Sequence, residues 1–275
     1  MDFRKLLLAL ATSLIVAACA TSPTGRKQLM LVSEQQAISA SRQAYAQEIG
    51  KYKQEGKLVD DPRLLNRIEQ ITERLVGQAV RMRPDSAQWQ WSVQVIEDPK
   101  TINAWCMAGG RMAIYTGLIQ KIDPTDDELA QVMGHEIAHA LANHTAERMS
   151  MALASNAGVL AAGVLSDNPG QSMALAAAAA QLAVQLPNSR TSENEADRIG
   201  IELAAKAGYD PRAAITLWQK MGKAGGGAPP EFLSTHPSDE TRYERLGKLA
   251  PKMLPQYQSG GSRPTHPVRM GPAAV

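Results

Sequence analysis

The sequence predicts a mainly helical α+β fold with a small antiparallel or mixed sheet. Apolar residues recur at helical spacing over several long stretches, and three short stretches have the apolar or alternating pattern of a strand. Alanine is frequent and aromatic residues make up only 4% of the chain, which favours closely packed helices over a β-sandwich. Because 44% of the 275 residues are hydrophobic and no repeat divides them, we expect one folded domain, over residues 33–254.

Helix-start signals predict where the main helices begin. Ser33 and Thr125 are each followed three residues later by Gln or Glu, which forms a capping box, and Asp61 precedes a proline at a first helical position. We expect helices over residues 33–53, from 62 through 75, over 125–154, 192–207 and 238–249, and one that starts at Asp210-Pro211.

Three strands are expected between the second and third of these helices. Residues 89–95 alternate between apolar and polar, and residues 103–107 and 111–115 are joined across Gly109-Gly110. Farther along, the alanine-rich segments 151–165 and 171–186 are each too short to span a membrane. Small residues let two helices pack closely, so we favour a helix pair over a membrane hairpin. Whether this pair forms a lid, an oligomer contact or core stays open.

Residues 1–18 have the pattern of a signal peptide, in which Arg4 and Lys5 precede an apolar run too short to cross a bilayer. The run ends in Val16-Ala17-Ala18-Cys19, which resembles the lipobox of bacterial lipoproteins. This resemblance implies cleavage before Cys19 and acylation of that residue, which anchors the chain in a membrane. Ala20 after the cysteine favours the outer membrane of a Gram-negative envelope, facing the periplasm. An ordinary secretory signal is the alternative.

The composition argues against nucleic-acid binding and against a metal site built from cysteines. The formal net charge is +2 without a cationic block, which argues against nucleic acid as a partner. The chain has two cysteines, Cys19 and Cys106, so any metal must be held by histidines and carboxylates. Cys106 is expected to be a buried strand residue.

The two ends of the domain are also expected from composition. Residues 19–32 have the composition of a linker after the acylated cysteine, and residues 255–275 that of a disordered tail.

The strongest chemical signal is His135-Glu136-Ile137-Ala138-His139. Residues four apart share one face of a helix, so His135 and His139 present their imidazoles one turn apart, as two ligands of a tetrahedral Zn²⁺ require. Glu136 lies beside them, where it can accept a proton from a water molecule whose pKa the metal lowers. With the His and Glu content of this chain, the motif arises by chance in roughly one shuffled sequence in 200. We expect one Zn²⁺ per chain.

A carboxylate is the expected third ligand. His144 is five residues after His139, which on a continuous helix is a rotation of 500°, so we expect it off the ligand face. His266 falls in the expected tail. Residues 189–197 supply Glu193 and Asp197, which are four apart and share a helix face. One of the two can bind the metal while the other accepts a hydrogen bond from a ligating imidazole.

The chain resembles zinc metallopeptidases of the Ste24/HtpX type, peptidase family 48 of the metallopeptidases, within the gluzincins. Matching stretches occur in the same order over residues 24–249: Gly25-Arg26-Lys27-Gln28-Leu29, Asn103-Ala104-Trp105, Gly109-Gly110, Thr116-Gly117-Leu118, HEIAH, SRTSENEAD, and Thr235-His236-Pro237 with Arg242. The resemblance implies a zincin-like metalloprotease domain. It also implies that Glu193 is the third zinc ligand and that Asp197 supports the site from behind, with Glu195 left as a polar helix residue.

His236 and Arg242 are further candidate site residues. His236 either faces the zinc, as a fourth ligand in a resting form or as a stabiliser of the oxyanion, or simply begins the last helix. Arg242 can support either role of His236 with a hydrogen bond or with its positive charge.

These residues predict a zinc endopeptidase of the cell envelope. Its substrate would lie extended along the strand that contains Asn103, Ala104 and Trp105, a mode that reads conformation and therefore suits unfolded or misassembled envelope and outer-membrane proteins. A membrane-tethered chaperone or assembly factor with little proteolysis is the alternative. A purely structural zinc site is the third reading, but it leaves Glu136 without a role.

Overall fold

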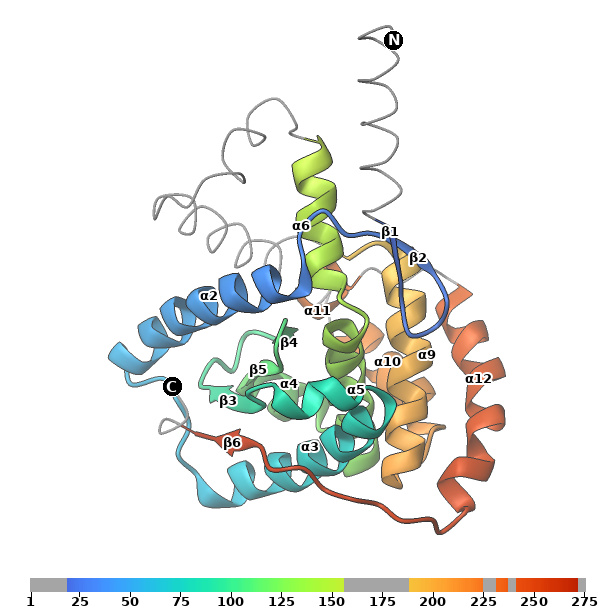
Figure 1. Cartoon of the computed structure of the whole chain (residues 1–275). Helices are drawn as coiled ribbons and strands as arrows, with labels where there is room; N and C mark the ends of the chain where they lie inside the picture. The colour runs from blue at the N-terminus through green and yellow to red at the C-terminus, as the bar shows by residue number, and fades with distance from the viewer. Residues whose placement is uncertain (1–18, 156–187, 225–230, 237–240, 272–275) are drawn as a thin grey trace, which may run out of the picture.

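Helices cover both faces of a small mixed sheet in this computed structural model, which describes residues 19–155, 188–224, 231–236 and 241–271 (Figure 1). The described helices are α2 (Glu34–Gln54), α3 (Pro62–Met82), η1 (Pro84–Gln88, a 3₁₀ turn), α4 (Thr116–Ile122), α5 (Asp126–Leu141), α6 (His144–Ser155), α9 (Arg190–Ala207), α10 (Ala213–Ala224), α11 (Glu231–Thr235) and α12 (Thr241–Gln258). The strands are β1 (Cys19–Thr21), β2 (Lys27–Leu29), β3 (Ser92–Ile96), β4 (Ala104–Met107), β5 (Arg111–Tyr115) and β6 (Arg269–Met270). The predicted mainly helical α+β fold is confirmed.

The four-stranded sheet has the order β4-β5-β3-β6. Strands β4 and β5 pair antiparallel across the Gly109-Gly110 turn, where both glycines have positive φ angles of 86° and 82°. Strand β3 pairs parallel with β5 and with β6. The predicted strand at 89–95 begins only at Ser92, because Trp89 still closes the 3₁₀ turn η1. Strand β4 is consequently an edge of this sheet.

The two faces of the sheet pack against different helices. Trp105, Met107 and Tyr115 pack against α2, whereas Ala104 and Ile114 belong to the larger core that α3, α5 and α9 share. This alternation follows from the two-residue period of a strand. Because both faces are covered, strands β3, β4 and β5 are buried along their whole length.

The predicted helix starts hold in detail. Ser33 and Thr125 each accept a hydrogen bond from the backbone three residues later, and the Gln36 and Glu128 side chains bond back to complete both capping boxes. Asp61 caps α3 in front of its proline. Helix α9 begins slightly earlier than predicted, at Arg190, and ends before Gly208 as predicted.

The predicted helix over 125–154 is two helices. Helix α5 ends at Leu141 and α6 begins at His144, and Asn143 between them has a φ of 56°, in the left-handed region. Asparagine tolerates this conformation better than most residues, and a left-handed residue ends a helix. The side chains after the break are therefore not placed by the rotation of α5.

Two glycines bring α5 and α9 into close contact. A Cβ atom on Gly134 would lie 2.9 Å from the carbonyl oxygen of Gly200, and one on Gly200 would lie 2.8 Å from the backbone nitrogen of His135. Both positions require glycine because the obstructing atoms belong to the backbone. The helix that contains HEIAH and the helix that contains Glu193 thus pack backbone to backbone.

The ends of the described chain differ most from expectation. The predicted linker contains a hairpin, in which β1 pairs antiparallel with β2 beside α6 and α9 (Figure 1). The prediction of a disordered tail from Pro255 is wrong for residues 255–271. Helix α12 continues to Gln258, and the chain then runs back along α3 to place β6 next to β3. Val268 is buried there, and burial overrides the Pro/Gly/Ser composition on which the prediction rested.

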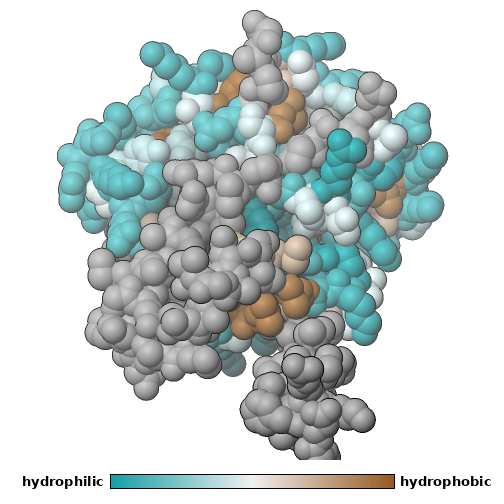
Figure 2. Space-filling model, turned by 90° about the horizontal axis from the view of Figure 1, so that it is seen from above, coloured by the Kyte–Doolittle hydropathy of each residue, from teal (hydrophilic) through white to brown (hydrophobic). Residues whose placement is uncertain are grey.

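Several predictions fall outside the described residues: the signal peptide at 1–18, most of the alanine-rich segments and the cap at Ser238. Within the described residues, every helix is too short or too polar to cross a membrane. Figure 2 looks down on the face from which α6 projects, and its described surface is mostly hydrophilic with small hydrophobic areas. The large apolar side chains that are exposed in the described chain are Leu31, Met151 and Tyr243.

Candidate metal centre

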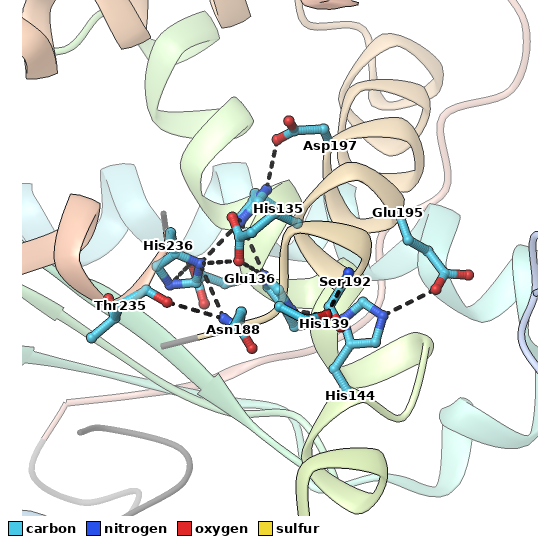
Figure 3. Close-up of polar contacts among 12 residues, drawn as sticks. His135, Glu136, His139, His144, Asn188, Ser192, Glu195, Asp197, Thr235 and His236 are labelled. Carbon is cyan, nitrogen blue, oxygen red and sulfur yellow. Dashed lines mark hydrogen bonds and ion pairs between the residues drawn. The ribbon is translucent and has the colours of Figure 1, made fainter. Parts of the chain in front are cut away.

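His135 and His139 lie one turn apart on α5 and face the same buried space, as their spacing predicts (Figure 3). Their Nε2 atoms are 3.1 Å apart, and each residue is 4% exposed. Two nitrogen lone pairs that face each other at this distance repel, so a shared proton or a cation must lie between them.

Glu193 brings a carboxylate to the same point from α9. Its Oε2 lies 3.3 Å from Nε2 of His135 and its Oε1 lies 3.3 Å from Nε2 of His139. Ser189 caps the start of α9, which places Glu193 in the first turn, and the contact of Gly134 with Gly200 fixes the distance between the two helices. The carboxylate is 1% exposed.

His236, just after α11, completes a group of four donors. Its Nδ1 lies 3.0 Å from Oε1 of Glu193 and 3.2 Å from Nε2 of His135. One ligand atom from each of His135, His139, Glu193 and His236 lies within 4.8 Å of the others. Ligand atoms of a tetrahedral ion with bonds of about 2.0–2.1 Å are about 3.3–3.4 Å apart, so these donors fit a cation such as Zn²⁺.

The electrostatics of the cluster favour ligand protonation states. Burial alone would raise the pKa of Glu193, but His236 and His135 outweigh it and hold that pKa well below its ordinary value. Burial lowers the pKa of His139, which keeps this imidazole neutral. Burial also opposes the charge on His135, yet Glu193 and Asp197 raise its pKa to about 9. A metal ion at this point would displace that proton.

Glu136 lies beside the cluster and is 2% exposed. Burial raises the pKa of its carboxyl group, with the charges of His236 and His135 acting against that rise. Its Oε1 lies 3.4 Å from Nε2 of His236 and makes no hydrogen bond to any described residue. A buried carboxylate with a raised pKa and an unused lone pair is suited to accept a proton.

Asp197 and Arg242 lie behind the candidate donors. Oδ1 of Asp197 is 3.1 Å from Nδ1 of His135, which orients that ring. Arg242 is buried, donates to Asp197 at 2.6 Å and to Glu193 at 3.2 Å, and stacks 3.5 Å over the ring of Trp218. Arg242 thus contacts the Asp197 and Glu193 carboxylates of α9 and positions both. From the sequence, it was expected to support His236 instead.

His144 and Glu195 are the site residues that sequence reasoning missed. His144 is fully buried, and its Nδ1 lies 2.8 Å from Nδ1 of His139 (Figure 3). Its Nε2 lies 3.2 Å from Oε2 of Glu195. The prediction that His144 lies outside the site was wrong because it assumed an unbroken helix. Asn143 is the one signal that could have indicated the break.

The predicted substrate strand lies next to the candidate centre. Strand β4 is a sheet edge and packs on α5, and Ala104 and Trp105 are buried within it. Just before it, Asn103 donates to Glu231 at 3.1 Å, and the carbonyl of Ile102 accepts from the backbone of Phe232. These bonds join the start of the strand to α11. Cys106 is buried in the same strand, and burial raises the pKa of its thiol, so it remains an unreactive thiol.

Comparison with known proteins identifies the family. The model of peptidase family M48 matches residues 62–250. The chain belongs to peptidase family M48. Members of this family that are similar to it include the mitochondrial metalloendopeptidase OMA1 of Homo sapiens, 34% identical over 243 residues, and that of Arabidopsis thaliana, 41% identical over 160 residues. The β-barrel assembly-enhancing protease of Escherichia coli is 28% identical over 207 residues.

These relatives are longer proteins. The matches cover 84%, 58% and 72% of this chain, but only 45%, 31% and 41% of the human, Arabidopsis and Escherichia coli proteins. The predicted class, a metallopeptidase, is confirmed at the level of the family. Two of these relatives are mitochondrial by name and one assists β-barrel assembly by name.

Proposed function

We propose that this chain is a zinc-dependent endopeptidase of the cell envelope. The observation that carries the proposal is the buried group of His135, His139, Glu193 and His236 with the Glu136 carboxyl beside it. Three donors together with a neighbouring general base are the requirements of metal-assisted peptide hydrolysis. A purely structural site would have no use for Glu136.

The residues around the cluster can perform the proton transfers of hydrolysis. Zinc, when bound, polarises the scissile carbonyl and lowers the pKa of a water molecule. Glu136 takes the proton as the water oxygen attacks the carbonyl carbon, and delivers it to the amine nitrogen as the C–N bond breaks. Asp197 and Arg242 hold His135 and Glu193 in place during both steps.

His236 distinguishes a resting form from an active one. Its Nδ1 stands among the other donors, which supports the role of fourth ligand in a resting form. A substrate or water molecule can then reach the centre only when His236 withdraws. Under this proposal His236→Ala increases the cleavage of small unfolded substrates. A fall in kcat without loss of zinc would favour the oxyanion role instead.

We infer that the substrates are unfolded or misassembled envelope proteins and that the enzyme is tethered through an acylated Cys19. The edge strand β4 supports addition of an extended segment beside α5, which selects for conformation. The lipobox pattern at residues 16–19 supports the tether, and the name of the Escherichia coli relative supports outer-membrane proteins as clients. Radiolabelled palmitate incorporation by wild type and Cys19→Ala tests the tether.

Digestion of casein and of an unfolded outer-membrane protein by wild type and Glu136→Gln tests the activity. Loss of the general base lowers the cleavage rate by about 10²–10⁴-fold while zinc content stays at one per chain. Glu202→Gln is the matched control and keeps full activity, because Glu202 is a half-buried glutamate on α9 that pairs with Lys206. Equal cleavage by wild type and Glu136→Gln would contradict the proposal.

The chaperone alternative gives a different result in the same experiment. If the chain is a tethered assembly factor that rarely cuts, wild type and Glu136→Gln promote the folding of an outer-membrane protein equally well. Neither digests it to any large extent.

A further inference from the structure

The β1–β2 hairpin contacts the candidate metal centre from outside the matched family region. Glu195, on α9, is 5% exposed and contacts side chains from the turn of this hairpin. Ser22 and Thr24 donate their hydroxyl hydrogens to its Oε1, and Nε of Arg26 donates to its Oε2 at 2.6 Å. A carboxylate that accepts three such bonds is held in one orientation.

Glu195 connects in turn to a metal ligand. Its Oε2 lies 3.2 Å from Nε2 of His144, and Nδ1 of His144 lies 2.8 Å from Nδ1 of His139 (Figure 3). The chain of contacts therefore runs from the hairpin through Glu195 and His144 to the ring whose other nitrogen faces the metal position. Glu195, His144 and His139 are all buried, so water does not compete for these bonds.

The proton positions along this chain follow from the donor inventory. If Nε2 of His139 offers its lone pair to a metal, its proton is on Nδ1 and is donated to His144. Nδ1 of His144 must then accept, which puts the His144 proton on Nε2, facing Glu195. Glu195 accepts there as well as from the hairpin. Each tautomer is fixed only if the carboxylate at the end of the chain stays in place.

The hairpin also holds the break from which His144 emerges. Nε2 of Gln28 donates to the carbonyl of Ala142 at 2.7 Å, next to Asn143. Both terminal nitrogens of Arg26 donate to Glu147 of α6 at 2.6 Å, so one guanidinium joins α6 to α9. A planar fork of this kind needs arginine, because lysine has a single charged nitrogen.

We propose that the hairpin of residues 19–29 is a positioning element of the metal centre, which fixes the tautomer and orientation of His139 through Glu195 and His144. The inference rests on the proposed zinc site. Because β1 begins at Cys19, the segment nearest the expected membrane anchor is also part of the support of a metal ligand. The centre is complete only while this hairpin is docked.

Zinc affinity of the full chain tests the inference, measured by competition with a chromophoric chelator. Arg26→Gln and Glu195→Gln each weaken zinc binding by about 10–100-fold, the usual effect of losing a partner of a ligating histidine. Arg26→Lys restores only part of the affinity because it cannot join Glu147 and Glu195. Matched controls are Lys27→Gln in the same hairpin and Glu202→Gln on the same helix, and both keep wild-type affinity.

The ¹⁵N chemical shifts of the imidazole rings separate positioning from general stability. In zinc-loaded wild type, His144 shows one tautomer with its proton on Nε2, and in Arg26→Gln and Glu195→Gln it shows a mixture. Wild-type affinity and a single His144 tautomer in both variants would overturn the inference and leave the zinc site intact. A fall in the Tm of metal-free Arg26→Gln with unchanged tautomers would overturn it too. Wild type that binds no zinc would overturn the proposed function together with the inference.

Discussion

Gly200 of α9 lies so close to His135 of α5 that a Cβ atom on Gly200 would be 2.8 Å from the His135 backbone nitrogen and 2.9 Å from its Cα. The two helices can approach this closely only because neither has a side chain at the crossing. Their approach sets how far Glu193 reaches towards the two histidines of α5, so a packing contact determines the size of the candidate metal centre.

Gly200→Ala is therefore expected to damage both stability and metal binding. The added methyl group meets backbone atoms that cannot rotate away, so the free energy of unfolding falls by about 1–3 kcal/mol and zinc affinity falls with it. Urea denaturation and chelator competition measure the two effects. Gly247→Ala on α12, where a Cβ would meet nothing within 4 Å, is the control and gains about 0.5–1 kcal/mol. Equal stability of the two variants would contradict this account.

Metal removal is expected to lower the melting temperature. Zinc at a concentration about 100 times its Kd adds about 2.7 kcal/mol to the folded state, since the four donors come together only on folding. For a domain of this size that corresponds to a rise in Tm of about 5–10 °C. Calorimetry with and without chelator measures it. His266→Ala, whose ring lies in the C-terminal segment away from the cluster, keeps the full shift, whereas His139→Ala loses most of it.

Acid is expected to weaken the start of α5. Burial would raise the pKa of Glu128, but bonds from Lys220, Thr216 and the Thr125 backbone outweigh it and lower that pKa below the ordinary value of 4.5. A lowered folded pKa means that the contribution is fully present above the ordinary value and disappears as the pH falls below it. Glu128→Gln thus lowers Tm most above about pH 5, and the gap to wild type narrows towards pH 3.

Denaturation curves at several pH values measure this gap. Glu244→Gln, which removes an exposed carboxylate on α12, should run parallel to wild type throughout. A gap for Glu128→Gln that widens on acidification would show that the sign is wrong.

Truncation is expected to reveal the C-terminal segment as part of the fold. A chain that ends at Ser259 loses the β6 pairing, the hydrogen bond from Gln94 to the Gly271 carbonyl and the buried Val268 side chain. Burying a valine is worth about 1.5–3 kcal/mol, so Tm drops by several degrees. A chain that ends at Gly271 keeps these contacts and serves as the control. Indistinguishable melting of the two chains would mean that the segment adds no stability.

Local sequence signals predicted the elements whose structure is locally determined. The capping boxes at Ser33 and Thr125 place two helices to within a residue, because the same side chains that define the motif make the bonds. The spacing of His135 and His139 likewise determines their geometry on a regular helix. Local signals failed where the bonds that order a segment come from distant residues. The segment after Pro255 is ordered by pairing with β3, and the segment after Cys19 is ordered by contacts with Glu195 and Glu147.

The site was predicted less completely than the fold elements, for the same reason. Glu193 and Asp197 were assigned by resemblance, because i and i+4 spacing alone does not say which carboxylate reaches the metal. Glu195 looked like an ordinary polar helix residue, since nothing local indicates that a hairpin from the other end of the chain covers it. Arg242 was expected to support His236, whereas it contacts Asp197 and Glu193, and this contact depends on how α12 packs on α9.

The left-handed turn at Asn143 has a consequence for interpreting other sequences with an HExxH motif. On a continuous helix, the residue five places after the second histidine points away from the metal, and a search by helical rotation discards it. One left-handed residue reverses that conclusion, because His144 turns back onto the ring of His139. Where Asn or Gly occupies the position before such a histidine, the helix can end there, and helical rotation alone no longer excludes the following side chain from the site.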